Sequence, residues 1–154
     1  MRRFLSFLLI IIVFSGCSSP EIYSYNEQFT NHIWNRFDLI ELEVPIRDEE
    51  ALYDLAIDFI HTQEYPSDHI AINFTVYFSS GGMRSRDYEF KLKDIKQQWT
   101  GKPIGEGYHH VLPLISSLKF PEKGVHRIRI ESKMTKFDLP GVESVGFKVL
   151  KSKD

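Results

Sequence analysis

Cysteine is nearly absent from this sequence: one residue, Cys17, occurs among 154. A single cysteine excludes an intrachain disulfide framework and the paired-cysteine spacings of zinc sites. The six histidines offer no substitute, because no two of them lie two or four positions apart. His109 and His110 are adjacent, and adjacent side chains leave opposite faces of a strand. We therefore expect no metal site and no cofactor.

Long apolar runs are also missing. The longest, Phe4 to Phe14 with one interruption, is shorter than the ~20 residues that a membrane-spanning helix needs. It follows Met1-Arg2-Arg3, and a basic start before a short apolar core is typical of a secretory signal peptide. Small residues then precede Cys17, which predicts a lipoprotein signal: residues 1–16 are removed and Cys17 carries the lipid. The alternative is a buried structural cysteine behind a signal-like core.

Excess positive charge is absent as well. Lys and Arg number 19 against 21 Asp and Glu, a net charge of −2, and removal of residues 1–16 takes two arginines and no acid with it. Nucleic-acid binding depends on clustered Lys and Arg against phosphates, so no nucleic-acid partner is expected. The same balance argues against a basic surface that would help a lipid to hold the membrane.

Sequence motifs of catalysis are missing too. No G-x-S-x-G element is present, and the spacing of Gly101, Gly105 and Gly107 matches neither the phosphate loop nor the dinucleotide fingerprint. Carboxylates are numerous, but they fall on strand faces predicted to be exposed. We expect no enzymatic activity and assign no catalytic residue. One alternative stays open, a hydrolase whose two acids meet only in space.

What the sequence has instead is a period-two alternation of apolar and polar residues, which predicts half-buried strands. The alternation covers residues 40–46, 70–78, 88–92, 127–131 and 145–149, and Gly81-Gly82 predicts a tight hairpin turn after the second of these segments. Such a series predicts an all-β fold, an antiparallel β-sandwich of the jelly-roll or immunoglobulin-like type. We predict residues 32–154 as this single domain, and residues 17–31 as the acylated cysteine with a polar tether.

One segment, residues 48–60, fits two interpretations. As a strand it places Tyr53, Leu55, Ile57 and Phe59 on one face. As a helix it would begin at Asp48 as N-cap and carry an apolar stripe. Its β-rich surroundings favour the strand.

The alternation stops at residues 97–110, where one tryptophan, three glycines, a proline and a tyrosine gather. Loops on a rigid sandwich often hold the working surface. We therefore predict a candidate interaction loop made of Trp99, Gly101, Gly105, Gly107 and Tyr108. Its two aromatic residues would stack on a sugar or anchor a protein partner. The alternative is that Trp99 plugs one end of the sandwich while the glycines let the chain turn.

Several stretches of the chain resemble, in order and spacing, the gliding-motility lipoproteins called GldH from Bacteroidetes. The resemblance covers most of residues 45–150. Besides the cysteine motif, its elements are Tyr65-Pro66, Gln98-Trp99-Thr100-Gly101, Gly105, Gly107, Phe120-Pro121, Gly124, Glu131, Met134, Leu139-Pro140-Gly141 and Val145-Gly146.

The resemblance implies an envelope lipoprotein with a non-enzymatic accessory or scaffold role. Its partners would belong to the gliding apparatus and the type IX secretion machinery linked to it. Ser18, rather than an aspartate, follows Cys17, which favours the outer membrane. Only Glu21 supplies acid near the anchor, which favours the periplasmic face over the cell surface. The second hypothesis is a glycan-binding module that uses Trp99, Tyr108 or Trp34 as a stacking platform.

Overall fold

The computed structural model describes residues 20–153. The predicted signal peptide and Cys17 lie outside the described residues. Within them the chain is almost entirely β-strand, and its helical element is one 3₁₀ turn at Thr30–His32. No helix in this range combines the length and the apolar character needed to cross a bilayer.

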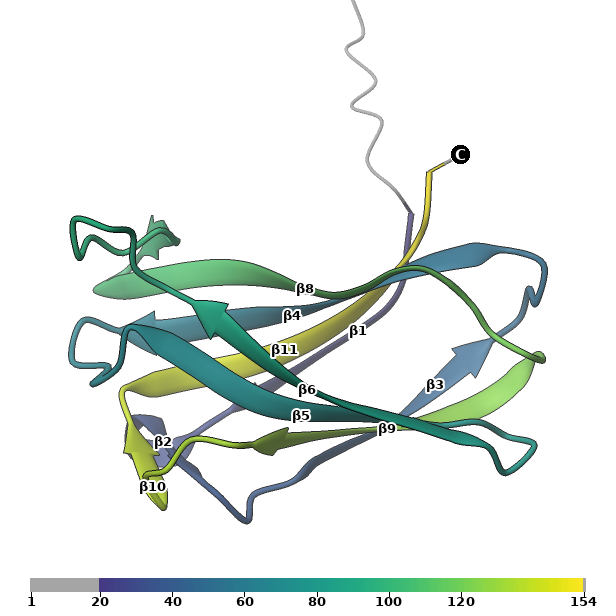
Figure 1. The fold of residues 1–154 in the computed structure, drawn as a ribbon, viewed down its shortest axis with the longest axis horizontal. Helices are drawn as coiled ribbons and strands as arrows, with labels where there is room; N and C mark the ends of the chain where they lie inside the picture. Colours follow the sequence, from purple (N-terminus) through teal and green to yellow (C-terminus); the bar gives the residue numbers. More distant parts are fainter. Residues whose placement is uncertain (1–19, 154) are drawn as a thin grey trace, which may run out of the picture.

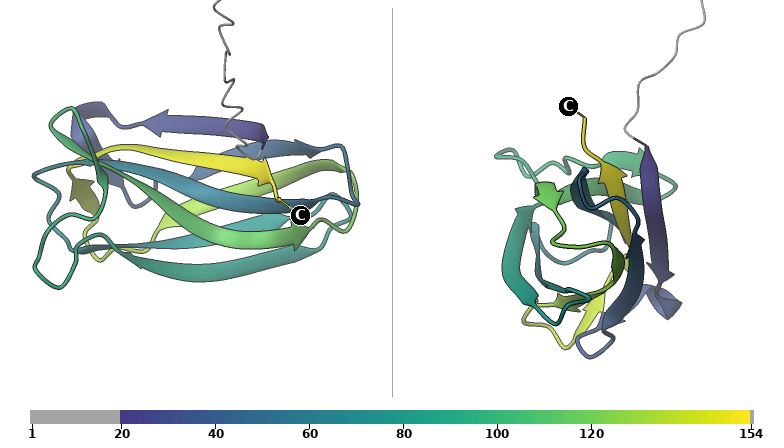
Figure 2. Two further views of the ribbon diagram at one scale, coloured as in Figure 1. Left: turned by 90° about the horizontal axis from the view of Figure 1, so that it is seen from above. Right: turned by 90° about the vertical axis from the view of Figure 1, so that its right-hand side faces the viewer.

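Two antiparallel sheets pack face to face around one core (Figures 1 and 2). The first has the order β1-β11-β4-β8-β7: Glu21–Gln28, Val142–Lys151, Leu52–Thr62, Gly107–Lys119 and Lys102–Ile104. The second has the order β3-β9-β5-β6: Ile40–Ile46, Gly124–Ser132, His69–Tyr77 and Met83–Lys91. A short ribbon of β2 (Ile33–Asn35) and β10 (Asp138–Pro140) lies at one end of the sandwich.

The connectivity identifies the type of sandwich. Strands β1, β11, β4 and β8 face strands β3, β9, β5 and β6, and β5–β6 is the hairpin that joins consecutive long strands of one sheet. Every other pair of long strands that are consecutive in the chain has one member in each sheet, so the chain crosses from one sheet to the other. Interleaved Greek keys of this kind define a jelly roll. The predicted all-β sandwich is confirmed, and of its two types the jelly roll is the one that forms.

The alternating segments become strands for the predicted reason. In β5 the inward residues Ile70, Ile72, Phe74 and Val76 are buried, whereas the residues between them lie toward the outer face. At the following turn Gly81 takes a φ of +101°, and the Phe78 N–H donates to the Gly82 carbonyl at 2.8 Å. A positive φ is strained for residues that carry a Cβ, so this turn requires glycine.

The ambiguous segment at residues 48–60 forms a strand, as predicted. Tyr53, Leu55, Ile57 and Phe59 of β4 point inward and are at most 2% exposed. Strand β4 lies at the centre of its sheet, between β11 and β8. A helix would have buried one stripe of this segment, whereas the central strand buries its whole inward face and Ala56 on the other face.

The predicted tether is wrong for most of its length. Residues 21–28 form β1, which pairs with β11 from Glu21 opposite Leu150 to Gln28 opposite Ser144. The Lys151 N–H also donates to the Pro20 carbonyl at 3.0 Å. The polar composition that suggested a tether reflects an edge strand, whose side chains are mostly exposed. The folded body therefore begins by residue 20 rather than residue 32.

Candidate functional site

The predicted interaction loop lies at the end of the sandwich where β4 finishes and β8 begins. Trp99 forms an isolated bridge with Lys93, and β7 then pairs with the start of β8. The indole of Trp99 is half-buried, and its ring centroid lies 4.4 Å from that of His61 and 5.8 Å from that of Tyr108. The ammonium of Lys93 sits 4.1 Å from its centre, a cation–π distance. This is the packing expected of a plug.

The glycines of this loop permit close packing. A Cβ at Gly107 would overlap the backbone carbonyl of His61, and a Cβ at Gly101 would lie 2.6 Å from Nε2 of His110. Gly105 differs: it has a φ of +53° and open space around it. Two of the three glycines therefore allow the loop to lie against β4 and β8, and the third allows the turn.

A pair of buried histidines lies beneath the loop. Nε2 of His61 is 3.1 Å from Nε2 of His110, and both residues are at most 6% exposed. Nδ1 of His61 is 2.8 Å from the Thr62 carbonyl, which can only accept, so this nitrogen carries the proton. Nε2 of neutral His61 is then the acceptor, and His110 donates. Burial is the main cause that lowers the pKa of both rings, that of His110 to about 4.

His109 and His110 leave opposite faces of β8, as predicted. His110 points inward to His61, whereas Nε2 of His109 lies 2.7 Å from Oδ1 of Asp58 on the outer face. Lys148 donates to the same carboxylate oxygen at 2.9 Å. Over residues 20–153, no three His, Cys, Asp or Glu side chains form a group that could hold a metal ion.

Trp34 does not serve as a stacking platform. It is fully buried, its ring stacks on Phe29 at 5.5 Å, and its indole N–H donates to the Asp38 carbonyl at 3.0 Å. A sugar could not reach either face of this ring. The hypothesis is wrong for Trp34.

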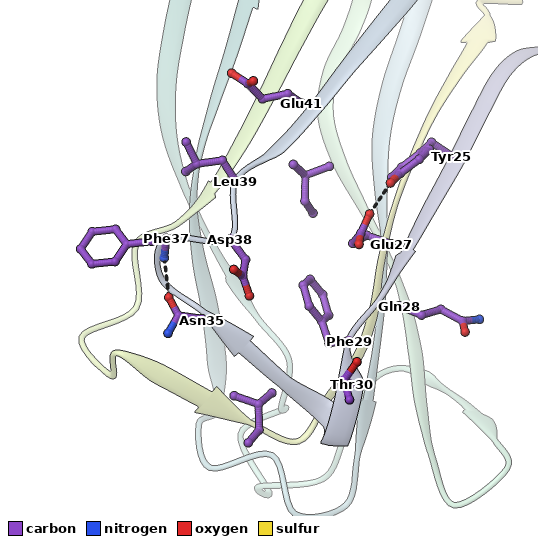
Figure 3. Close-up of a pocket in the computed structure, with 12 residues that line it drawn as sticks. Tyr25, Glu27, Gln28, Phe29, Thr30, Asn35, Phe37, Asp38, Leu39 and Glu41 are labelled. Carbon is purple, nitrogen blue, oxygen red and sulfur yellow. Dashed lines mark hydrogen bonds between the residues drawn. The ribbon is translucent and has the colours of Figure 1, made fainter.

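A surface groove lies on the other flank of the same end, between the edge strands β1 and β3 (Figure 3). Its volume is about 800 Å³. Tyr25, Glu27 and Phe29 line it from the β1 side, and Asp38 and Glu41 line it from the loop before β3 and from β3 itself. The Tyr25 hydroxyl donates to Glu27, and both side chains are drawn at the groove.

At the rim of this groove the protein exposes an apolar patch, which we define as Ile33, Phe37, Leu39 and Phe137. The first three of these residues also line the groove. Phe37 is 72% exposed and Phe137 51% exposed, and their rings meet edge to face at 5.1 Å. In Figure 3 the Phe37 ring points outward, away from the body. Exposed aromatic clusters on a soluble body are typical of binding surfaces.

Sequence reasoning missed this groove. Half of it comes from β1, which composition had assigned to a tether, and the other half from the unremarkable Asn35–Glu41 segment. The available signal was the placement of Tyr23, Tyr25 and Glu27 at alternate positions, which all face inward on β1 beside Val149, Phe147 and Val145. That period of two predicts a strand, although a short one.

The fold and the site define a class of protein: a jelly-roll domain with a groove and an apolar patch at one end. A model of the GldH lipoprotein family matches residues 21–149, so the chain belongs to this family. It is similar to a gliding motility lipoprotein GldH homolog of Christiangramia forsetii, with 26% identity over 153 residues that cover 95% of this chain and 93% of the relative. No solved structure matches. The resemblance seen in the sequence is thereby confirmed, and membership implies a membrane-anchored envelope lipoprotein.

Proposed function

We propose that this protein is a non-enzymatic accessory or scaffold lipoprotein of the outer membrane that docks other envelope proteins on its apolar patch. Its partners are components of the surface-motility apparatus and of the secretion machinery linked to it. Family membership and the name of the C. forsetii relative support the motility role. The exposed pair of Phe37 and Phe137 carries the docking role.

The position of the patch relative to the lipid supports this proposal. Strand β1 begins at Glu21, four residues after Cys17, so the chain between them spans at most about 14 Å. The body is therefore held close to the membrane at this end of β1. The patch lies beyond the other end of β1, at the ribbon of β2 and β10 (Figure 1). Eight strand residues separate the two ends by about 25 Å. Aromatic side chains at that distance face envelope proteins rather than lipid, on the periplasmic side in this proposal.

The proposal is tested in native membranes with the lipidated full chain. A Phe37→Ser/Phe137→Ser variant should lose its co-purifying envelope proteins at least tenfold, measured by quantitative mass spectrometry after detergent solubilisation. Val111→Ser/Val125→Ser is the matched control, because these side chains are exposed to a similar degree, 54% and 55%, elsewhere on the surface. Equal recovery of partners with both variants would contradict docking at the patch. An unmodified thiol at Cys17 would contradict the anchoring.

A further inference from the structure

Three carboxylates surround the groove between β1 and β3, and no lysine or arginine belongs to its lining. They are Glu27, Asp38 and Glu41. In the described part of the chain no cation forms an ion pair with any of them. The acidic row continues to Glu43, which adds to burial in raising the pKa of Tyr23 across the seam. Arg129 and Arg127 lie opposite Glu41 and Glu43 in the register of β3 with β9 but form no ion pair with them. The carboxylates that line the groove would therefore still attract a bound cation.

Both sides of the groove are free strand edges. Among residues 20–153, β1 pairs with β11 alone and β3 with β9 alone. Their other edges therefore present backbone N–H and C=O groups that no strand uses, the arrangement that accepts an added extended chain. Pro45, which has no N–H, lies toward the far end of β3 and leaves the groove end open.

The other sheet edges carry different features. On β6, the guanidinium groups of Arg84 and Arg86 lie over the rings of Phe78 and Tyr88. Charged side chains at an edge are a common device against strand addition. On the opposite sheet, β7 is three residues long and contains Pro103. Strand β7 covers β8 only from Gly107 to His109, so the rest of β8 is a further free edge. The pair β1 and β3 differs from it in bordering a groove whose charged lining side chains are all acidic.

The groove also offers apolar surface. Phe29 is half-buried in its floor and packs against the core, and Leu39 is 44% exposed at its rim. A ligand that fits this groove must place basic groups against the acidic side chains and apolar groups against Phe29 and Leu39. In an extended chain successive side chains point in opposite directions, so cations and apolar groups alternate along it.

We infer that the groove between β1 and β3 binds an extended segment of a partner protein in which Lys or Arg alternates with apolar residues. The inference rests on the proposed docking function and specifies the chemistry of the partner. The basic side chains meet Glu27, Asp38 and Glu41, the apolar ones lie on Phe29 and Leu39, and the backbone of the segment pairs with a free edge.

A second copy of this chain suits the groove less well. Its basic edge is β6, but Arg84 and Arg86 there already lie on rings of their own chain. The outer face of β6 carries Asp87 and Glu89, which pair with outward residues of β5. If β6 of one copy extended the sheet at β3 of another, these acids would meet Glu41 and Glu43. Opposed like charges disfavour that pairing.

The test places a photo-crosslinking amino acid at Leu39 in the groove or, separately, at Phe137, the patch residue outside the groove lining, of the lipidated full chain in living cells. Mass spectrometry then maps the residues captured at each position. We expect Leu39 to capture an extended basic and apolar segment of another envelope protein. The variant Glu27→Gln/Asp38→Asn/Glu41→Gln should reduce this capture at least tenfold. The matched control, Glu64→Gln/Glu89→Gln/Glu106→Gln, removes the same charge from exposed positions outside the groove and should leave capture unchanged.

A charge exchange completes the test. Glu41→Lys should abolish capture at Leu39, and replacing the mapped basic residue of the partner by Glu should restore it. Capture at Leu39 that is unchanged in the neutralised variant, or that yields only this same chain, would overturn the inference. In either case capture of an envelope protein at Phe137 would leave the proposed docking function standing. Absence of capture at both positions would overturn the two together.

Discussion

The two flanks of one end of this sandwich differ in how they are packed: one is closed by side chains and the other is open to solvent. On the flank of β8 the chain closes the end: Trp99, Tyr108 and the buried pair His61–His110 fill the space under a loop whose glycines let it lie flat. On the flank of β1 the end stays open, with a groove of about 800 Å³ and the aromatic side chain of Phe37 exposed.

The difference shows how composition misleads. The glycine- and tryptophan-rich segment stands out in the sequence, and the structure uses it mainly for packing. The segment around Phe37 and Leu39 is ordinary in composition, and it forms the exposed surface. Trp99 is half-buried against His61 and Tyr108, whereas the ring of Phe37 is 72% exposed.

The largest effect should come from Gly107→Ala on the closed flank. A methyl group there overlaps the His61 carbonyl, so β8 must move away from β4. We expect a loss of about 3 kcal/mol in the free energy of unfolding. Urea denaturation followed by tryptophan fluorescence measures it.

Gly105→Ala is the matched control for this change. Nothing lies within 4 Å of the added methyl group, and the cost is the positive φ of +53° alone, about 1 kcal/mol. If both variants lost the same free energy of unfolding, the overlap with the His61 carbonyl would not be the cause of the loss at Gly107.

The second effect is a pH dependence of stability. Burial lowers the pKa of His61 and His110 in the folded state, that of His110 from 6.5 to about 4. Between these values the unfolded chain binds more protons, so stability is full above pH 6.5 and falls as the pH drops toward 4. Lys93 and His109 disfavour the added charge as well. We expect about 2 kcal/mol to be lost between pH 7 and pH 4.5 in denaturant titrations.

The variant His110→Gln tests the origin of this pH dependence. An amide can still donate to Nε2 of His61, but it does not titrate. The loss between pH 7 and pH 4.5 should shrink, and what remains is the contribution of His61. An unchanged profile would assign the acid sensitivity to other groups.

A smaller effect is expected for Trp99→Ala. Full burial makes such a truncation cost 3–5 kcal/mol, and the half-exposed indole of Trp99 reduces this to about 1.5 kcal/mol. The accompanying prediction is that partner capture at Leu39 stays intact, because Trp99 lies on the closed flank. Loss of capture without loss of stability would contradict the assignment of Trp99 to the closed flank and would make it part of the docking surface.

The smallest effect on stability is expected on the open flank. Phe37 is 72% exposed, so Phe37→Ser should change the free energy of unfolding by no more than about 0.5 kcal/mol. The same change should reduce recovery of partners from native membranes. Thermal unfolding beside quantitative recovery measures both, and a destabilisation above about 2 kcal/mol would make Phe37 a structural residue.

Much of the fold could be predicted because it depends on local pattern. The alternation in Ile40–Ile46 and His69–Tyr77 sets which side chains are buried, and Gly81-Gly82 sets the hairpin. Strand β1 was missed because an edge strand buries little, and its polar side chains resemble those of a linker. The groove was missed for the same reason, since β1 forms one of its walls.

The sequence by itself determined the all-β class, the burial of alternate residues and the family, because each is written in spacing along the chain. Only the tertiary structure decided that His61 meets His110 across 49 positions and that two free strand edges border an acidic groove. Those features depend on which strands become neighbours in a jelly roll. That choice arises from packing two whole sheets together, and no short stretch of the chain contains it.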